Sequence, residues 1–118
     1  MKSQRFHVII DIDQCQQTSL TDAGGLENFI KSLVASIHMN VLKGPIVAEG
    51  IPENPGLSSF VIIDFSHCSI HTFTNCNEAM IDVFSCKEFD IDVAMKMARE
   101  YFATEASEVR ERKIWWGG

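Results

Sequence analysis

The sequence predicts an α+β fold, a two-layer sandwich in which a mostly antiparallel sheet carries two helices on one face. Three observations support this prediction. The predicted elements follow the order strand, helix, several strands, helix, strand. Both helical segments carry an apolar stripe that must lie on a sheet. No repeat, low-complexity tract or interdomain linker interrupts the chain, so we expect one domain spanning residues 1–118.

The first half of the chain predicts strand, helix and strand in turn. Apolar and polar residues alternate over residues 6–12, which indicates a strand with one face packed inward. A polar stretch with two adjacent glycines predicts a loop over residues 14–25. Residues 26–37 repeat apolar side chains at steps of three and four, the pattern of an amphipathic helix. Residues 41–48 predict a second strand, weakened by Gly44 and Pro45.

The second half predicts the rest of the sheet and a second helix. Two prolines indicate a loop over residues 50–56. Residues 57–64 have the Val-, Ile- and Phe-rich composition of a buried strand, and 68–73 and 79–86 predict two more. Asp90 can cap a helix whose apolar stripe ends at Phe102, and 108–115 predict a last strand. The second face of the sheet then needs cover, which another protomer could supply.

Composition limits the classes of function. With 46% hydrophobic and 22% charged residues, the 118-residue chain has the balance of a globular domain, but one small enough to benefit from dimerisation. A formal net charge of -6 argues against nucleic-acid partners and suits a cationic small molecule. No segment approaches the roughly 18 apolar residues of a membrane span. We expect a cytoplasmic protein with reduced cysteines, because no export signal is apparent.

The densest group of reactive side chains directly follows the predicted strand 57–64. It is the run Ser66-His67-Cys68-Ser69-Ile70-His71-Thr72. Spacing alone leaves three interpretations: a serine or cysteine nucleophile beside a histidine base, a metal site, or a polar edge strand with ordinary hydrogen bonds. The absence of a Cys-x-x-Cys pair argues against the metal site, and we assign no metal ligand.

This run resembles the Ser-His-x-Ser/Thr-Ile-His-Thr signature of the prokaryotic, pyruvoyl-dependent S-adenosylmethionine decarboxylases. A second block, residues 79–86, resembles the family's Ala-Ala-Ile/Val-Asp-Leu/Val-Phe-Thr-Cys block at the same spacing. Gly56 and Ser58 match a Gly-x-Ser that the family places before its central strand, and the N-terminal strand is similar as well. The resemblance covers nearly the whole chain.

The resemblance implies a self-cleaving lyase. Ser66 would attack the carbonyl of Phe65, split the chain there and become the pyruvoyl cofactor. Ser58 and His71 match residues that assist this processing, as suits a hydroxyl donor and an imidazole base. The ketone would form a Schiff base with S-adenosylmethionine for spermidine and polyamine synthesis, and Cys86 matches the family's proton donor. The site would lie in a homodimer of cleaved protomers.

Three departures from the family matter: those at Asn75 and Pro52 bear on substrate recognition, and the one at Phe65 changes the surroundings of the ketone. Phe65 replaces the usual glutamate before the cleaved serine, Asn75 replaces an acidic residue, and Pro52 stands where an aromatic residue stacks on adenine. We therefore carry Pro52, Cys68 and Asn75 as candidate substrate-binding positions, although Cys68, like Cys15 and Cys76, has no matching role and is interpreted as structural. The alternatives are the same chemistry on arginine or ornithine, and an unprocessed, non-catalytic homologue.

Overall fold

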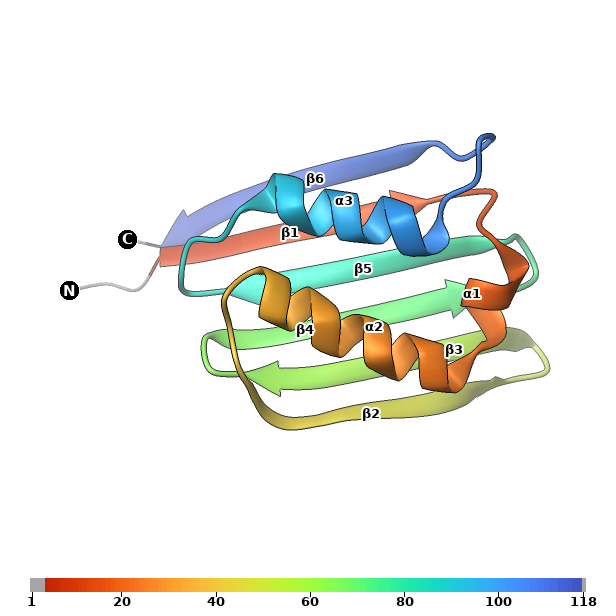
Figure 1. Cartoon of the computed structure of the whole chain (residues 1–118), viewed down its shortest axis with the longest axis horizontal. Helices are drawn as coiled ribbons and strands as arrows, with labels where there is room; N and C mark the ends of the chain where they lie inside the picture. Colours follow the sequence, from red (N-terminus) through yellow and green to blue (C-terminus); the bar gives the residue numbers. More distant parts are fainter. Residues whose placement is uncertain (1–3, 118) are drawn as a thin grey trace.

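A six-stranded antiparallel sheet forms one layer of the molecule, and the helices form the other (Figure 1). The computed structural model describes residues 4–117. Neighbouring strands follow the order β2-β3-β4-β5-β1-β6. The elements are β1 (Gln4–Ile12), α1 (Gln17–Thr21), α2 (Ala23–Ser36), β2 (Val41–Ile51), β3 (Asn54–Ile63), β4 (Ser66–Phe73), β5 (Glu78–Ser85), α3 (Ile91–Phe102) and β6 (Val109–Gly117).

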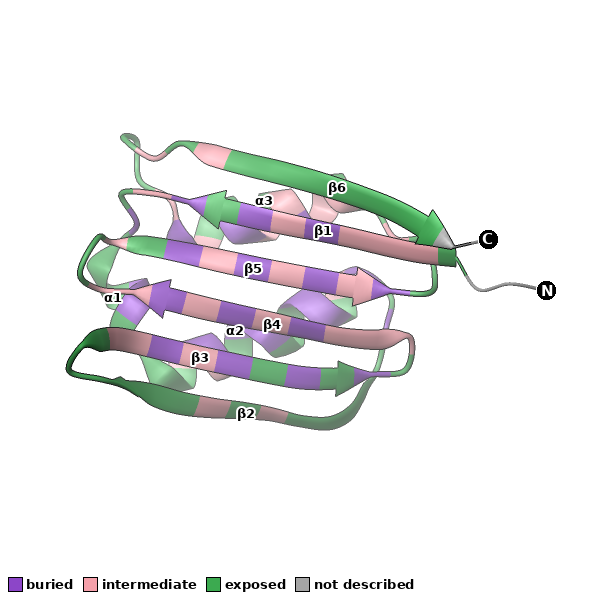
Figure 2. Ribbon diagram, turned by 180° about the vertical axis from the view of Figure 1, so that it is seen from behind, coloured by how far each residue is buried: buried purple, intermediate pink, exposed green. Residues whose placement is uncertain are grey.

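The core lies between the helices and one face of the sheet. Burial alternates along the central strands, so every second side chain points toward the helices (Figure 2). The inward set from the sheet includes Val8, Val61, Ile70 and Ile81, all fully buried. Opposite them pack the apolar stripes of α2 and α3, with Leu26, Ile30, Leu33, Ala94, Ala98 and Phe102. No helix within residues 4–117 has the length and apolar character needed to cross a membrane.

One buried threonine ties three elements together at the α1 end of the sheet. The Thr72 hydroxyl accepts a hydrogen bond from the Leu57 N–H and donates one to the Leu20 carbonyl, each at 2.8 Å. The backbones of Gly56 and Thr72 approach so closely here that a Cβ on Gly56 would collide with the Thr72 carbonyl oxygen. Gly56 also has φ +147°, a conformation that favours glycine. The predicted Gly-x-Ser motif therefore has a structural reason for its glycine.

The predicted fold class and the order of its main elements are confirmed, with two local differences. The stretch expected as a loop, residues 14–25, contains the short helix α1 and the start of α2. Strand β2 runs through Gly44 and Pro45 to Ile51 and β3 begins at Asn54, so the loop expected over residues 50–56 is only a short turn. Proline is tolerated because β2 is an edge strand and its register with β3 shifts between Lys43 and Ile46, so Pro45 lies at an irregularity of the ladder.

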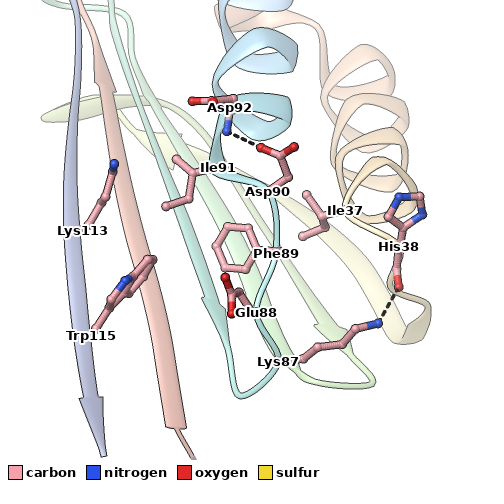
Figure 3. Close-up of a pocket in the computed structure, with 10 residues that line it drawn as sticks. All are labelled: Ile37, His38, Lys87, Glu88, Phe89, Asp90, Ile91, Asp92, Lys113 and Trp115. Atoms are coloured by element: carbon pink, nitrogen blue, oxygen red, sulfur yellow. Dashed lines mark hydrogen bonds between the residues drawn. The ribbon is translucent and has the colours of Figure 1, made fainter.

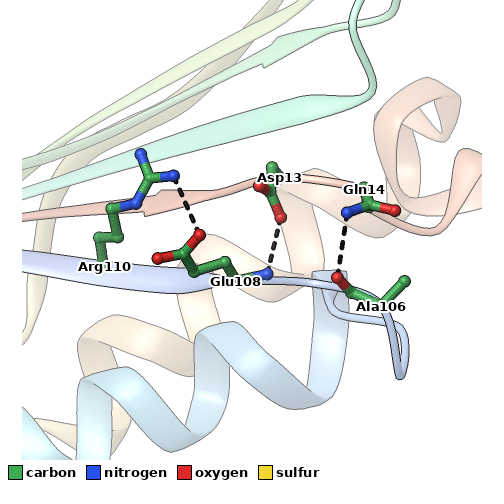
Figure 4. Close-up of polar contacts among 5 residues, drawn as sticks. All are labelled: Asp13, Gln14, Ala106, Glu108 and Arg110. Carbon is green, nitrogen blue, oxygen red and sulfur yellow. Dashed lines mark hydrogen bonds and ion pairs between the residues drawn. The ribbon is translucent and has the colours of Figure 1, made fainter.

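The second edge strand, β6, is anchored where its chain leaves α3. The Glu108 N–H donates to the Asp13 carboxylate, and the Gln14 side-chain amide donates to the Ala106 carbonyl at 3.1 Å (Figure 4). Arg110 pairs with the Glu108 carboxylate at 3.1 Å. The bonds to Asp13 and from Gln14 join the approach to β6 to the end of β1, and the two strands pair along their length.

Candidate active site

The predicted cleavage point lies in the tight turn between β3 and β4. Phe65 ends this turn and Ser66 begins β4. Ser66 has φ +141°, a region that L-residues with a Cβ rarely adopt. Such a conformation costs on the order of 1–3 kcal/mol and persists only where the surrounding structure enforces it. The backbone is therefore strained at the residue that the sequence singled out.

Cys86 meets this turn from the neighbouring strand. Its backbone N–H donates a hydrogen bond to the Phe65 carbonyl oxygen at 2.9 Å. Ser66 pairs with Ser85, the last residue of β5, so the two ends are held in register. The Cys86 side chain is exposed. The structure thus brings together three residues that the sequence predicted for one site: Phe65, Ser66 and Cys86.

Ser58 and His71 form a second, separate pair. They face each other across β3 and β4, and the Ser58 hydroxyl lies 2.8 Å from His71 Nδ1. Both belong to the sheet face turned away from the helices. His71 stands five residues from Ser66 on the same strand, which corresponds to about 17 Å at roughly 3.3 Å per residue. Within one chain, this pair cannot reach the Phe65–Ser66 peptide bond.

The candidate substrate-binding positions also divide between the faces and ends of the sheet. Pro52 lies in the β2–β3 turn and Asn75 in the β4–β5 turn, both exposed and both at the Ser58–His71 end. Cys68 is fully buried on the helix-covered face. Desolvation by burial raises the pKa of its thiol to about 12. A side chain enclosed in this way has no route to a ligand, so the assignment of Cys68 to substrate binding is not retained.

An aromatic row crosses the open face of the sheet. The His67 ring stacks on Phe60 with centroids 5.2 Å apart and meets the edge of Phe84 at 5.4 Å. Phe84 in turn stacks on His7 at 5.1 Å and contacts Trp116 at 6.0 Å. Several members of this face remain exposed, among them Phe60, Ile62, Ile114 and Trp116. The open face thus carries exposed apolar and aromatic side chains where the solvated side of an antiparallel sheet is usually polar.

Two contributors at the site were not assigned from the sequence. His7 Nε2 lies 2.8 Å from the Asp82 carboxylate on the open face, which gives Asp82 a partner. Lys87 follows Cys86 and places its ammonium 5.0 Å from the centre of the Phe65 ring. His7 lies in the N-terminal strand that resembles the family, although the resemblance gives it no role, and Lys87 lies outside the matched blocks. Only the proximity of Lys87 to Cys86 in the chain could have drawn attention to it.

The metal alternative finds no supporting geometry in the part of the chain that the structure describes. Among residues 4–117, no group of three or more His, Cys, Asp or Glu side chains is placed to hold an ion. His67 and His71 lie four residues apart on one strand, about 13 Å at roughly 3.3 Å per residue. That separation is too large for both to bind a single ion.

Comparisons with known proteins converge on one family. The family model described as S-adenosylmethionine decarboxylase matches residues 6–113. An S-adenosylmethionine decarboxylase proenzyme of Thermomicrobium roseum is 34% identical over 112 residues, covering 94% of this chain and 93% of the relative. A proenzyme of the same name from Oceanobacillus iheyensis is 30% identical over 109 residues, covering 89% and 82%.

The fold has a counterpart among solved structures. The crystal structure of the adenosylmethionine decarboxylase from Aquifex aeolicus superposes with a TM-score of 0.74 at 17% identity. The match covers 95% of this chain and 91% of that one. At such low identity, this likeness supports the fold alone, whereas the family model and the two proenzymes match at the level of sequence. The chain belongs to the S-adenosylmethionine decarboxylase family, whose members are carboxy-lyases.

Proposed function

We propose that this chain is a proenzyme that cuts itself between Phe65 and Ser66 and then decarboxylates S-adenosylmethionine in the cytoplasm for polyamine synthesis. One observation carries the proposal. The residue that would attack, Ser66, has a strained backbone with φ +141°, and the carbonyl that it would attack already accepts the Cys86 N–H at 2.9 Å. Strain released on cleavage and a donor on the developing oxyanion both favour this reaction.

The processing steps follow from the chemistry of these groups. The Ser66 hydroxyl oxygen adds to the Phe65 carbonyl carbon, and the peptide C–N bond breaks to leave an ester. Loss of the Ser66 Cα proton to a base then breaks the Cβ–O bond, so Phe65 leaves as a carboxylate that keeps both oxygens. The dehydroalanine at position 66 becomes an imine, which water converts to the ketone with release of ammonia. A hydroxyl donor and an imidazole base are needed, as Ser58 and His71 provide.

We infer that Ser58 and His71 act on the partner subunit's cleavage site in a homodimer. His71 and Ser66 lie near opposite ends of β4 in one chain, about 17 Å apart at roughly 3.3 Å per residue. If a second copy packed its open sheet face against this one with its strands antiparallel, the Ser58–His71 pair of each chain would lie near Ser66 of the other. The apolar open face supports this packing, because Phe60, Ile62 and Trp116 would gain cover.

In the mature enzyme, the pyruvoyl group supplies a ketone that binds the substrate amine and withdraws electrons as carbon dioxide leaves. The protein must then return a proton to the substrate carbon. Cys86 is suited to this task, since it is exposed, directly follows β5 and is held at the cleavage point by the bond from its N–H to the Phe65 carbonyl. Cys86→Ser should still yield cut chains but lose about 100-fold or more in decarboxylation rate, the usual scale of general acid catalysis.

The first test is the mass of the purified protein. Two fragments divided between Phe65 and Ser66 are expected, together with a carbonyl that borohydride reduces, and Ser66→Ala should remain one intact chain. A wild-type chain that stays whole under every condition that activates its relatives would remove the cofactor and leave a non-catalytic homologue.

A mixing experiment tests whether the pair acts across the dimer. Ser66→Ala keeps the Ser58–His71 pair but has no nucleophile, whereas His71→Ala keeps the nucleophile but lacks the base. Neither variant alone should be cut, but co-expression with distinguishable tags should cut the His71→Ala chain. If that chain stays whole in a mixed dimer, His71 does not act on its partner.

One observation supports basic amino acids, arginine or ornithine, as a second candidate substrate class. Asn75 is exposed and neutral where the family resemblance expects an acidic residue, and a carboxylate there would favour a sulfonium cation. Release of carbon dioxide from S-adenosylmethionine, arginine and ornithine, measured in parallel on the cut protein, separates the candidates. We expect S-adenosylmethionine to be preferred; a preference for either basic amino acid would assign this chain the same chemistry on another substrate.

A further inference from the structure

Lys87 is fixed beside the predicted cleavage point by several contacts. Its backbone N–H donates to the Ser85 hydroxyl at 2.9 Å, and that hydroxyl donates back to the Lys87 carbonyl at 2.7 Å. The side chain reaches toward the end of α2, where Nζ donates to the His38 carbonyl at 3.4 Å (Figure 3). The same ammonium lies over the Phe65 ring, 5.0 Å from the ring centre. Lys87 thus links the segment after β5 to the turn that would be cut.

The electrostatic influence of Lys87 extends to the residue before Phe65. The pKa of Asp64 is lowered because the Asn40 side chain and backbone donate to its carboxylate, with a smaller contribution from the positive charge of Lys87. The cation and the β3–β4 turn are therefore close enough to interact before any cleavage.

Self-cleavage of the proposed kind changes the charge of this turn. Ordinary hydrolysis of a peptide bond creates an ammonium and a carboxylate together. Here the nitrogen leaves as ammonia and position 66 becomes a neutral ketone, so only the Phe65 carboxylate is added. The new anion adjoins Asp64 and directly faces the reactive group. An unpaired carboxylate in this position would be repelled by Asp64 and free to move toward the site.

We propose that Lys87 is a positioning residue that binds the carboxylate left on Phe65 and holds the cut end beside the pyruvoyl group. The inference rests on the proposed function. One carboxylate oxygen is the former carbonyl oxygen, which keeps the Cys86 N–H. The other comes from the Ser66 hydroxyl and is open to the Lys87 ammonium, whose flexible stem can turn from the Phe65 ring to the adjacent carboxylate.

The carboxylate can be observed directly in protein labelled with 1-¹³C-phenylalanine. Of the eight phenylalanine carbonyl carbons, only Phe65 would become a titrating carboxylate. In the cut wild type its pKa should lie about 0.5 below that of the cut Lys87→Met variant, the shift expected for an exposed pair worth about 0.7 kcal/mol. Lys87→Arg should retain the low pKa, and added salt should reduce the difference. Lys96→Met removes an exposed lysine on α3 and should titrate like the wild type.

A second measurement works at neutral pH and does not depend on stability in acid. Carboxypeptidase A removes aromatic C-terminal residues, so it should trim Phe65 from the cut chain about 2- to 5-fold faster in Lys87→Met than in the wild type. Lys87→Arg should be protected, and Lys96→Met should match the wild type. Cut chains whose Phe65 titrates and is trimmed alike in wild type and Lys87→Met overturn this inference alone. A chain that is never cut overturns the proposed function and, with it, the inference.

Discussion

Replacing Gly56 with alanine is expected to destabilise the chain severely, because two independent constraints meet at this position. The added Cβ would collide with the Thr72 carbonyl oxygen of the neighbouring strand. Alanine would also have to adopt φ +147°. The unfavourable backbone conformation costs about 1–3 kcal/mol. Forcing β3 away from β4 costs about 1–3 kcal/mol more.

A hydrogen bond next to Gly56 adds to this cost. The Leu57 N–H, which donates to the buried Thr72 hydroxyl at 2.8 Å, would move with the strand. Weakening it costs about 1 kcal/mol, so the three contributions together amount to a loss of about 3–7 kcal/mol. Because Ser58 is two residues further along β3, the same displacement should misplace its contact with His71 and slow self-cleavage.

Urea unfolding followed by circular dichroism measures this loss. The Ser66→Ala background keeps each chain in one piece, so that unfolding can be treated as a single transition. Gly24→Ala is the matched control, because a Cβ there meets nothing closer than the Asp22 carboxylate at 3.7 Å and Gly24 lies in α2. The control should be unchanged or stabilised by up to about 1 kcal/mol. A Gly56→Ala chain within about 1 kcal/mol of its parent would refute the close-approach argument.

Three further predictions concern polar and titratable groups. Thr72→Val should cost about 2–4 kcal/mol of unfolding free energy in the same urea assay, because it leaves a buried N–H and a buried carbonyl without a partner, whereas Thr72→Ser should retain most of the stability. The Asn40 hydrogen bonds are the main cause of the lowered pKa of Asp64 in the folded chain. The ionised Asp64 therefore stabilises the fold above its unfolded pKa, and this stabilisation is lost as pH falls through the folded pKa. In the Ser66→Ala background, the chain with Asp64 should therefore have the higher urea midpoint at neutral pH, and its advantage over the chain with Asp64→Asn should shrink below about pH 4. Iodoacetamide should label exposed Cys86 at neutral pH but leave Cys68 unmodified, since burial raises the Cys68 pKa to about 12. Peptide mass mapping locates the label, and rapid labelling of Cys68 in folded protein would contradict its placement in the core.

Much of the fold could be predicted from the sequence because hydrophobic periodicity is a local signal. The alternation over residues 6–12 and the three-and-four spacing over 26–37 both correspond to observed elements, β1 and α2. The short helix α1 was missed, since its five residues carry no repeating apolar stripe and it is held by contacts with distant segments. The length of β2 was also underestimated. Whether a strand tolerates Pro45 depends on its being at the sheet edge, which is a property of the whole sheet.

For the candidate site, local motifs identify the reactive residue types, but long-range strand pairing selects which of these residues meet. The resemblance singled out Phe65, Ser66 and Cys86, and strand pairing places them together. It also singled out Ser58 and His71, yet a β-strand is rigid and extended, so these two lie at the other end of the sheet, and the proposed processing role needs a second copy of the chain to bring them to Ser66. The same alternation of faces that buries Cys68 leaves its neighbours His67 and Ser69 half-buried on the open face, a consequence of which face the helices cover. The contact between Lys87 and Phe65 joins residues 22 positions apart through strand register, which no local pattern in the chain records.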